Sequence, residues 1–527
     1  MVTRALTLQH ERLEIPAQSD WLMIPEIQVV LERDILPAYL ARARWYPGRN
    51  ANKISPAITA AIPFGRMDDT DIWLTAFEAA QDGLVHRYLL PLLIEWGVSR
   101  HSEPFHIAAV RQEGRDGTLI DAATDRLFVS TLLQSLRCRF RIDGIQQSPR
   151  LEFLPGANFM TRSGTPRRIR PIKTEQSNST AIIDDRYVAK IYRKLQAGTS
   201  PEIEMGRFLS DIARFRNTPA LEGSVELIEG AQRTAIAVIH AFVANDGDAW
   251  SVSAACIDKF LQMQRKGDNA SDPANEEPRH VYQRHMAQIG KRVGEMHVAL
   301  ASRADMQGFR PEEISRADVS EWTGDILLRS RRVSSELASM SHSLGEPDRN
   351  KLDEVATKLL LINSQLEELL PPEASGVKIR HHGDLHLGQI LVAGDDVYII
   401  DFEGEPSRSM FERRRKAPAA RDVAGIIRSI DYSLMAALYR HGAGEQRERL
   451  RPILAAWREE ATIAFLTSYR QAIVGSSLWP TGFAADRMLS FFLLEKVIYE
   501  IEYEMWYRPD WVGVPLGAVA RILQSIC

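Results

Sequence analysis

The segment from residue 381 to residue 406, HHGDLHLGQILVAGDDVYIIDFEGEP, constrains the fold more than any other part of the chain. The apolar run that begins at Gln389 predicts a β-strand, Gly394–Asp396 predicts a turn, and the apolar run after it predicts the returning strand. In a β-hairpin the end of the returning strand lies beside the start of the first strand. We therefore expect Asp384, Gln389 and Asp401 to lie together at one end of a β-hairpin.

The composition narrows the class of protein. A chain of 527 residues is too long for one ordinary core, so we expect two or three domains. The net charge of -4 gives no basic field for nucleic acid. Three scattered cysteines form neither a disulfide framework nor a zinc motif, which favours a reducing cytoplasm. The charged N-terminus does not resemble a signal peptide, and no apolar run reaches the ~18 residues of a membrane helix.

The order of predicted elements favours an α+β fold. Alternating segments up to about residue 110 predict a small β-rich unit, a strand-rich unit follows, and the chain beyond residue 250 is mostly helical, without βαβ alternation. Residues 266–278 predict a loop, and the basic run Arg413–Lys416 is expected to face solvent or an anionic ligand. Helices are predicted at 34–44, 118–140, 280–303, 316–340, 350–370, 421–440, 446–475 and 485–507.

The predicted hairpin end carries the groups that phosphoryl transfer requires. That reaction needs a carboxylate for the acceptor hydroxyl and oxygen ligands for Mg²⁺. Asp384-x4-Gln389 matches the Asp-x4-Asn spacing of the protein-kinase catalytic loop, and Asp401-Phe402-Glu403-Gly404 loosely matches the Asp-Phe-Gly metal motif. Glu403 or Glu405 could add a metal ligand. The alternative is that both aspartates are ordinary turn and cap residues of a hairpin.

A second group of residues lies upstream. The small polar loop that includes Ser177, Asn178 and Ser179 could bring backbone N–H groups to phosphate, although it lacks the G-x-G-x-x-G pattern. Lys190 follows Val188-Ala189 on a predicted strand, like the strand lysine of kinases, and Glu204 in the next helix could pair with it. Alternatively, Lys190 is a surface lysine and Glu204 a solvated helix acid.

Taken together, these residues resemble bacterial maltokinases, in the aminoglycoside-phosphotransferase-like branch of the protein-kinase fold. The resemblance spans most of the chain, and the segments that carry it are 44–48, 175–179, 201–204, 245–250, 382–389, 400–406, 421–424, 495–504 and 508–511. The resemblance implies a bilobal protein-kinase-like fold with an N-terminal cap at 1–112, an intermediate part completing the N-lobe at 113–243, and a mainly helical C-lobe at 244–527.

The resemblance also implies ATP-dependent phosphorylation of maltose to maltose 1-phosphate with Mg²⁺. Carried over, Asp384 is the catalytic base, Gln389, Asp401 and Glu403 serve the metal, and Lys190, held by Glu204, contacts the nucleotide phosphates. ATP would lie between the lobes, against the loop at Ser177, Asn178 and Ser179 and the linker at His240, Phe242 and Val243. A functional or physical link to trehalose synthase in α-glucan metabolism is implied as well.

The acceptor sugar is expected at an amphipathic helix near the C-terminus. Tyr499 and Tyr503 lie one turn apart, as do Glu500 and Glu504, and aromatic faces and carboxylates are the groups that bind sugars. The alternative is core tyrosines and solvated glutamates. With the resemblance, the acceptor residues are His382, His386, Glu495, Lys496, Tyr499, Glu500 and Tyr503.

Other functions stay open at this point. The same fold could phosphorylate glucosamine or an aminoglycoside, because specificity resides in the pocket. A trehalose synthase would need a (β/α)₈ barrel, for which the chain lacks the repeated strand–helix alternation. A non-catalytic partner of trehalose synthase, or another pseudokinase, would not require Asp384, Asp401 and Lys190.

Overall fold

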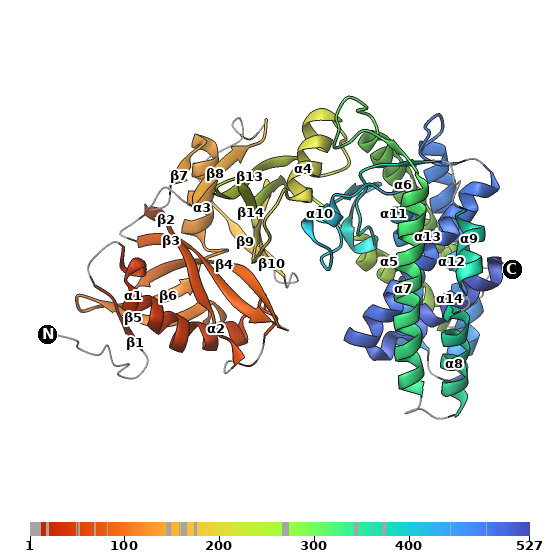
Figure 1. Cartoon of the computed structure of the whole chain (residues 1–527), viewed down its shortest axis with the longest axis horizontal. Helices are drawn as coiled ribbons and strands as arrows, with labels where there is room; N and C mark the ends of the chain where they lie inside the picture. Colours follow the sequence, from red (N-terminus) through yellow and green to blue (C-terminus); the bar gives the residue numbers. More distant parts are fainter. Residues whose placement is uncertain are drawn as a thin grey trace. The chain divides into compact units, whose positions relative to one another are not determined.

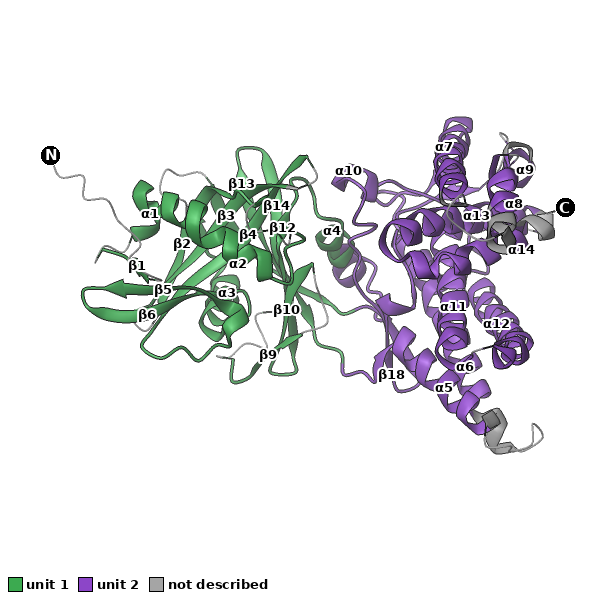
Figure 2. Ribbon diagram, turned by 90° about the horizontal axis from the view of Figure 1, so that it is seen from below, with its two compact units in different colours: residues 1–207, 219–243 green, residues 208–218, 244–527 purple. Residues whose placement is uncertain are grey.

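In the computed structural model the chain forms two compact units (Figure 2). Unit 1 comprises residues 1–207 and 219–243, and unit 2 comprises residues 208–218 and 244–527. The second predicted boundary, at 243/244, coincides with the passage from unit 1 to unit 2. The residues that the structure describes are 12–16, 20–48, 50, 53–67, 70–81, 83–143, 149–157, 159, 166–172, 177–265, 273–341, 346–360, 362–371, 376–442, 444–480 and 482–526.

Unit 1 begins with a largely antiparallel sheet. Its strands run in the order β1-β5-β6-β4-β3-β2, with β12 added against β4, and only β1 pairs in parallel. Strand β3 is buried on both faces, since Trp73 and Phe77 lie in one core cluster and the alternate residues Ile72 and Leu74 lie in another. The strands are β1 (Arg12–Glu14), β2 (Ala57–Met67), β3 (Thr70–Gln81), β4 (Leu84–Trp96), β5 (His106–Gln112), β6 (Arg115–Asp121) and β12 (Lys194–Leu195).

One face of this sheet carries the helical segment α1 (Pro25–Val30), a π turn at Leu31–Ile35, and α2 (Leu36–Arg42) (Figure 1). The predicted helix at 34–44 is therefore the second half of a longer helical segment. The predicted boundary at 112/113 falls within the turn of the β5–β6 hairpin, so the first sheet continues to Asp121.

A buried ion pair ties the first sheet to the strands that follow. Asp121 accepts hydrogen bonds from Arg193 Nη2 at 2.7 Å and from Tyr39 Oη at 2.6 Å. Trp45 donates its indole N–H to the same carboxylate at 3.2 Å, and Arg193 stacks over its ring. Trp45 is half-buried and Tyr46 is buried, because both rings pack into the aromatic core of the sheet.

The second sheet of unit 1 has the order β7-β8-β13-β14-β11-β10-β9. Its buried face packs against α3 (Arg126–Cys138), and α4 (Pro201–Arg207) follows the sheet's β11 and the short β12. The predicted helix at 118–140 was wrong over its first residues, because Leu119 and Ile120 belong to β6. The strands are β7 (Arg141–Asp143), β8 (Arg150–Pro155), β9 (Ile169–Ile172), β10 (Asn178–Ile183), β11 (Tyr187–Tyr192), β13 (Leu221–Glu229) and β14 (Gln232–Ala241).

Unit 2 is mainly helical. At its centre α6 packs parallel to α12 and α11 packs parallel to α13, whereas α11 and α12, which follow each other in the chain, pack antiparallel. The prediction of one helix at 350–370 is corrected to α8 and α9, and Pro278, predicted in a loop, lies inside α6. The helices are α5 (Ala249–Arg265), α6 (Pro273–Leu300), α7 (Arg316–Ser341), α8 (Glu346–Leu360), α9 (Asn363–Leu369), α10 (Met410–Arg413), α11 (Ala420–His441), α12 (Glu445–Ala472), α13 (Phe483–Tyr507) and α14 (Gly513–Ile526).

The predicted hairpin is confirmed in unit 2. β18 (Ile390–Ala393) pairs antiparallel with β19 (Asp396–Ile399), with Ile390 opposite Ile399 at its open end. β15 (Gly247–Asp248) extends this sheet, and β16 (Glu312–Glu313) pairs separately with β17 (Val377–Lys378). The predicted α+β class is confirmed. Within the described residues, no helix is long and apolar enough to cross a bilayer.

Candidate active site

The open end of the β18–β19 hairpin brings Gln389 and Asp401 together. Ile400 donates its N–H to the Gln389 carbonyl at 3.0 Å, which extends the strand pairing by one step. Gln389 Nε2 then donates to Asp401 Oδ2 at 2.8 Å. Asp401 adopts the left-handed backbone region, with φ +66°, which an aspartate tolerates better than most residues but which still costs free energy. Strain at such a residue is typical of functional sites.

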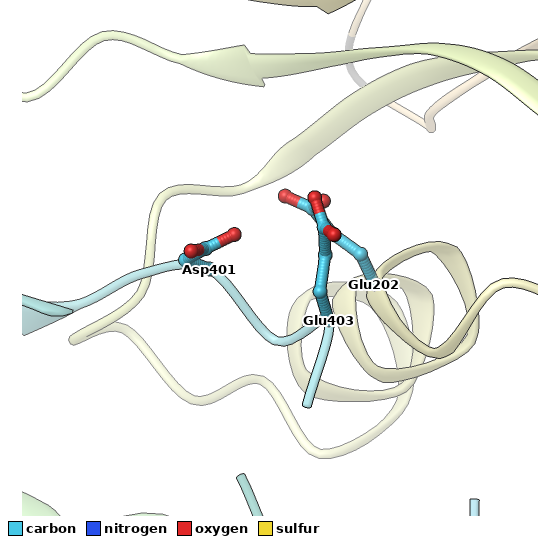
Figure 3. Close-up of side chains that lie close together, drawn as sticks. All are labelled: Glu202, Asp401 and Glu403. Atoms are coloured by element: carbon cyan, nitrogen blue, oxygen red, sulfur yellow. The ribbon is translucent and has the colours of Figure 1, made fainter. Parts of the chain in front are cut away.

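The same loop carries a second carboxylate, Glu403, two residues after Asp401 (Figure 3). The hydrogen bond from Gln389 to Asp401 holds the two side chains next to each other. The amide oxygen of Gln389 and the carboxylate of Asp401 are both hard oxygen donors. Hard oxygen donors, few in number, are what Mg²⁺ accepts in nucleotide sites. The residues present therefore fit a magnesium ion.

Buried Asp422 supports the loop that carries Asp384. Its carboxylate accepts the backbone N–H of His382 at 2.7 Å and that of Gly383 at 2.9 Å. His297 contacts the same carboxylate at 3.1 Å and Tyr469 at its other ring nitrogen. Burial alone would raise the pKa of Asp422, but the hydrogen bond from His297 and the neighbouring histidines hold that pKa well below its usual range. The backbone before Asp384 is thereby held by a buried anion.

His382 links the two loops. One ring nitrogen donates to the Ile400 carbonyl at 2.8 Å, so the other is the acceptor that faces the Asp384 N–H at 3.4 Å. The side chain packs on Phe402 and is 2% exposed. The prediction that His382 contacts the acceptor is therefore wrong. Both ring nitrogens are occupied, one by the carbonyl of Ile400 and the other by the N–H of Asp384.

Asp384 itself lies on an accessible wall. About one quarter of its side chain is exposed, and Lys496 Nζ lies 3.7 Å from Asp384 Oδ1. Lys496 also lies over the ring of Tyr499, 4.9 Å from its centroid. His386 lines the same wall, and burial lowers the pKa of its imidazole below the usual value. The carboxylate is thus open to a ligand, beside a cation and a neutral imidazole.

The loop after Asp401 is held by arginines. Glu405 pairs with Arg408 at 2.8 Å, and Arg413 donates to the carbonyls of Pro406 and Arg408 at 2.7 and 2.9 Å. Arg413 is buried, so the expectation that the basic run at 413–416 faces solvent is wrong for its first member. Gly404, at φ +72°, leaves room for this arginine, because a Cβ there would lie 3.2 Å from Arg413 Cβ.

A large pocket opens beside Asp384. Its volume is about 1170 Å³, and aromatic rings and paired charges line it. Tyr499, Tyr503 and Tyr507 form a ladder along α13, with successive ring centroids 6.3 and 4.9 Å apart, as the i,i+4 spacing predicts. The lining residues are Trp250, Arg329, Asp384, His386, Gly388, Pro406, Ser407, Gly425, Ser429, Tyr432, Lys496, Tyr499, Glu500, Glu502, Tyr503, Glu504, Trp506, Tyr507, Arg508 and Trp511.

Each of the four carboxylates of this pocket has a basic partner. The pairs are Asp384 with Lys496, Glu500 with Arg428, Glu502 with Arg329 and Arg332, and Glu504 with Arg508. Burial raises the pKa of Glu500 although Arg428 opposes this shift. Of the predicted acceptor residues, His386, Lys496, Tyr499, Glu500 and Tyr503 line the pocket, whereas Glu495 forms a two-fold contact with Arg421.

In unit 1, Lys190 on β11 pairs with an acid of α4. Lys190 Nζ lies 3.2 Å from Glu202 Oε2, and His240 on β14 contacts the other oxygen at 3.1 Å (Figure 3 shows Glu202). Burial opposes ionisation, but Lys190 and His240 keep the pKa of Glu202 far below its usual value. The partner predicted for Lys190 was Glu204, and the structure gives this role to Glu202. Residues two apart on a helix point about 200° apart.

The remaining predicted nucleotide residues lie on or next to the second sheet. Ser177 is exposed, while Asn178 and Ser179 begin β10, where Ser179 Oγ accepts a hydrogen bond from Arg193 at 2.7 Å. Phe242 and Val243 follow β14, and the Phe242 N–H donates to the Arg186 carbonyl at 2.7 Å. Residues 173–176 of the predicted phosphate loop lie outside the described residues.

Comparison with known proteins identifies the family. The model of the phosphotransferase enzyme family matches residues 168–457, which include Lys190, Asp384 and Asp401. The chain belongs to this family. Residues 39–125 match the maltokinase N-terminal cap domain, and they contain the end of α2 and strands β2 to β6 of the first sheet.

Two curated proteins and several solved structures are similar to this phosphotransferase. It is 27% identical over 348 residues to a glucosamine kinase of Streptacidiphilus jiangxiensis, covering 66% of this chain and 71% of the relative. It is 26% identical to a glucosamine kinase of Mycolicibacterium smegmatis, covering 69% and 82%. A glucosamine kinase structure in complex with glucosamine, ADP and inorganic phosphate aligns at 21% identity with a TM-score of 0.60, over 89% of this chain and 94% of that one. A second crystal form aligns at 20% identity and a TM-score of 0.62, over 94% and 99%. The kinase-like fold with an N-terminal cap is confirmed.

Proposed function

We propose that this phosphotransferase transfers the γ-phosphoryl group of ATP to the anomeric hydroxyl of maltose, giving maltose 1-phosphate. The observation that carries the proposal is the aromatic pocket beside Asp384, whose carboxylates are all paired with bases. Tyrosine and tryptophan faces cover the C–H faces of sugar rings, and a volume of about 1170 Å³ admits a disaccharide.

In the proposed reaction, Asp384 accepts the proton of the attacking hydroxyl and Lys496 holds the carboxylate in place. Gln389 and Asp401, with Glu403 nearby, hold Mg²⁺, which neutralises charge on the nucleotide phosphates when it is bound. Lys190 contacts the nucleotide phosphates and Glu202 fixes its ammonium group. Basic partners already neutralise the charge of the carboxylates in the acceptor pocket, so the ligand need not be a cation. The remaining lone pairs of these carboxylates can accept hydrogen bonds from sugar hydroxyls.

Glucosamine is the second candidate acceptor, because the relatives are named glucosamine kinases. An ammonium group gains most from a carboxylate that has no other cation. In this pocket the ammonium would compete with a basic side chain for every carboxylate: with Lys496, Arg428 or Arg508, or with Arg329 and Arg332 at Glu502. A neutral acceptor meets no such competition, which favours maltose.

The test is phosphate transfer from labelled ATP with Mg²⁺ to maltose, glucose, trehalose, glucosamine and kanamycin. The proposal expects label on maltose alone, at its reducing end. Transfer to glucosamine or kanamycin instead would refute the acceptor and retain the reaction. Binding of ATP without transfer to any sugar would favour a pseudokinase. A cytoplasmic location and an association with trehalose synthase stay predictions, for which co-purification from cells is the direct measurement.

A further inference from the structure

Unit 2 contains a second large cavity that the proposed reaction does not use. Its volume is about 980 Å³, and it lies among α8, α11, α12, α14 and the segment at residues 509–512. It shares no lining residue with the acceptor pocket. A cavity of this size in a folded protein is large enough for a whole small ligand.

The charge of this cavity is positive. Five basic side chains line it, Lys358, Arg447, Arg451, Arg458 and Arg521, against three acidic ones, Glu354, Asp431 and Asp510. Two of the acids are not available to a cation. Glu354 pairs with Lys358 at 2.7 Å, and Asp431 is 3% exposed beneath its arginine partners.

Three guanidinium groups share the single carboxylate of Asp431. Arg428 and Arg521 each lie 2.6 Å from it, and Arg458 lies 3.5 Å away, at the limit of a hydrogen bond. Within the described part of the chain, neither Arg458 nor Arg521 contacts a second acid. Because each guanidinium has five N–H donors, most of their donors are not used by Asp431.

The crowding of these cations affects the pKa of Arg521. Burial lowers the pKa of Arg521, and the nearby Arg458 and Arg428 lower it further against the opposing effect of Asp431. Arg458 and Arg521 thus carry more positive charge than the carboxylate of Asp431 balances. An added anion would relieve this repulsion.

Part of the cavity wall is apolar, next to these charges on α11 and α12. Leu434, Leu438 and Leu454 are buried side chains along it, and the ring of Tyr439 stands at one side. An ion as small as phosphate would fill only a small part of the space. The walls therefore suit a ligand that has both an anionic head and an apolar or aromatic body.

We propose that this cavity binds a phosphate monoester with an apolar or aromatic group, its phosphate between Arg458 and Arg521 and its body against the leucine wall. Arginine pairs recognise phosphate through several parallel N–H donors. The site lies two ion pairs from the acceptor pocket, since Arg428 joins Asp431 to Glu500, which lines that pocket.

Isothermal titration calorimetry of the full chain with phenyl phosphate tests the site without any turnover. We expect saturable binding that weakens at least tenfold in Arg458→Gln/Arg521→Gln. Asp431 keeps Arg428 in this variant, so its carboxylate is not left unpaired. Arg470→Gln is the matched control, because Arg470 pairs with Asp486 at 2.6 Å and is similarly exposed. Equal affinity in the double variant, or no binding at millimolar phenyl phosphate, would overturn the proposal.

Two further variants locate the ligand. Met435→Trp adds bulk to the wall of the cavity and keeps every charge, so it should weaken binding of phenyl phosphate more than binding of inorganic phosphate. If inorganic phosphate binds the wild type as tightly as phenyl phosphate does, the apolar wall plays no part and the proposed ligand class is wrong. Lys496→Gln should leave the binding heat unchanged. Loss of the heat in that variant would assign it to the acceptor pocket and overturn the new site.

Discussion

Replacing Asp422 by asparagine should lower the stability of unit 2 strongly. The side chain is 1% exposed, and its two oxygens accept N–H groups of His382 and Gly383 at 2.7 and 2.9 Å. An asparagine keeps one acceptor oxygen and turns an N–H₂ group toward the other donor. One backbone N–H is then buried without a partner, which costs about 1–3 kcal/mol, and the remaining contacts lose their charge assistance, which adds about 1–2 kcal/mol.

We therefore expect Asp422→Asn to lower the free energy of unfolding by about 2–5 kcal/mol in urea titrations. Because Asp384 follows directly on the two residues that Asp422 holds, kcat should fall more than KM for ATP rises. Asp258→Asn is the control, since Asp258 is about one-third exposed with Arg440 and His441 as partners, and such a pair contributes less than ~1 kcal/mol. If the free energy of unfolding of Asp422→Asn lies within about 0.5 kcal/mol of the wild-type value, the range of ordinary surface substitutions, this reasoning is refuted.

The remaining predictions concern the reaction, acid stability and the first unit. Asp384→Ala should reduce kcat by roughly a hundredfold or more while ATP binding in calorimetry persists, and near-normal turnover would exclude the base role. Asp401→Ala should weaken Mg²⁺-dependent ATP binding and leave Mg²⁺-free binding unchanged; equal loss in both would exclude the metal role. Burial lowers the pKa of His381 to about 3, below its ordinary value of 6.5, so the unfolded state binds the extra proton as pH falls from 6.5. Stability should drop by about 2 kcal/mol between pH 7 and pH 5 from this group, and His381→Gln should flatten that slope if the assignment is right. Asp121→Asn leaves Arg193 buried without its full partner and should cost about 3–5 kcal/mol, whereas the exposed pair of Asp116 with Arg111 should contribute little; similar losses at both sites would contradict the burial argument.

The parts of the site that are local in sequence were predictable. The hairpin end, with Gln389 bonded to Asp401, follows from strand and turn signals within 13 residues. The tyrosine face of α13 was predictable for the same reason, since residues spaced by four align on one face, and Tyr499 and Tyr503 line one pocket.

Errors arose where a residue's partner lies far away in the chain or where the face of a helix decides the contact. Glu202 and Glu204 are equivalent by composition, and only the rotation of α4 against β11 and β14 selects Glu202. His382 was assigned to the acceptor by the family resemblance, yet its ring bonds to the carbonyl of Ile400, 18 residues away. Asp422 was noticed within a matching motif, but its support of the loop 40 residues earlier was not visible there.

The sequence by itself determined the α+β class, the hairpin with its carboxylates and the aromatic helix near the C-terminus, because periodicity and turn chemistry act over neighbouring residues. Only the tertiary structure decided which acids are paired, which histidine is buried, and that three arginines converge on Asp431 at the edge of a second cavity. Burial and ion pairing are properties of side chains brought together from distant segments, and the free energy of a charge depends on exactly those neighbours.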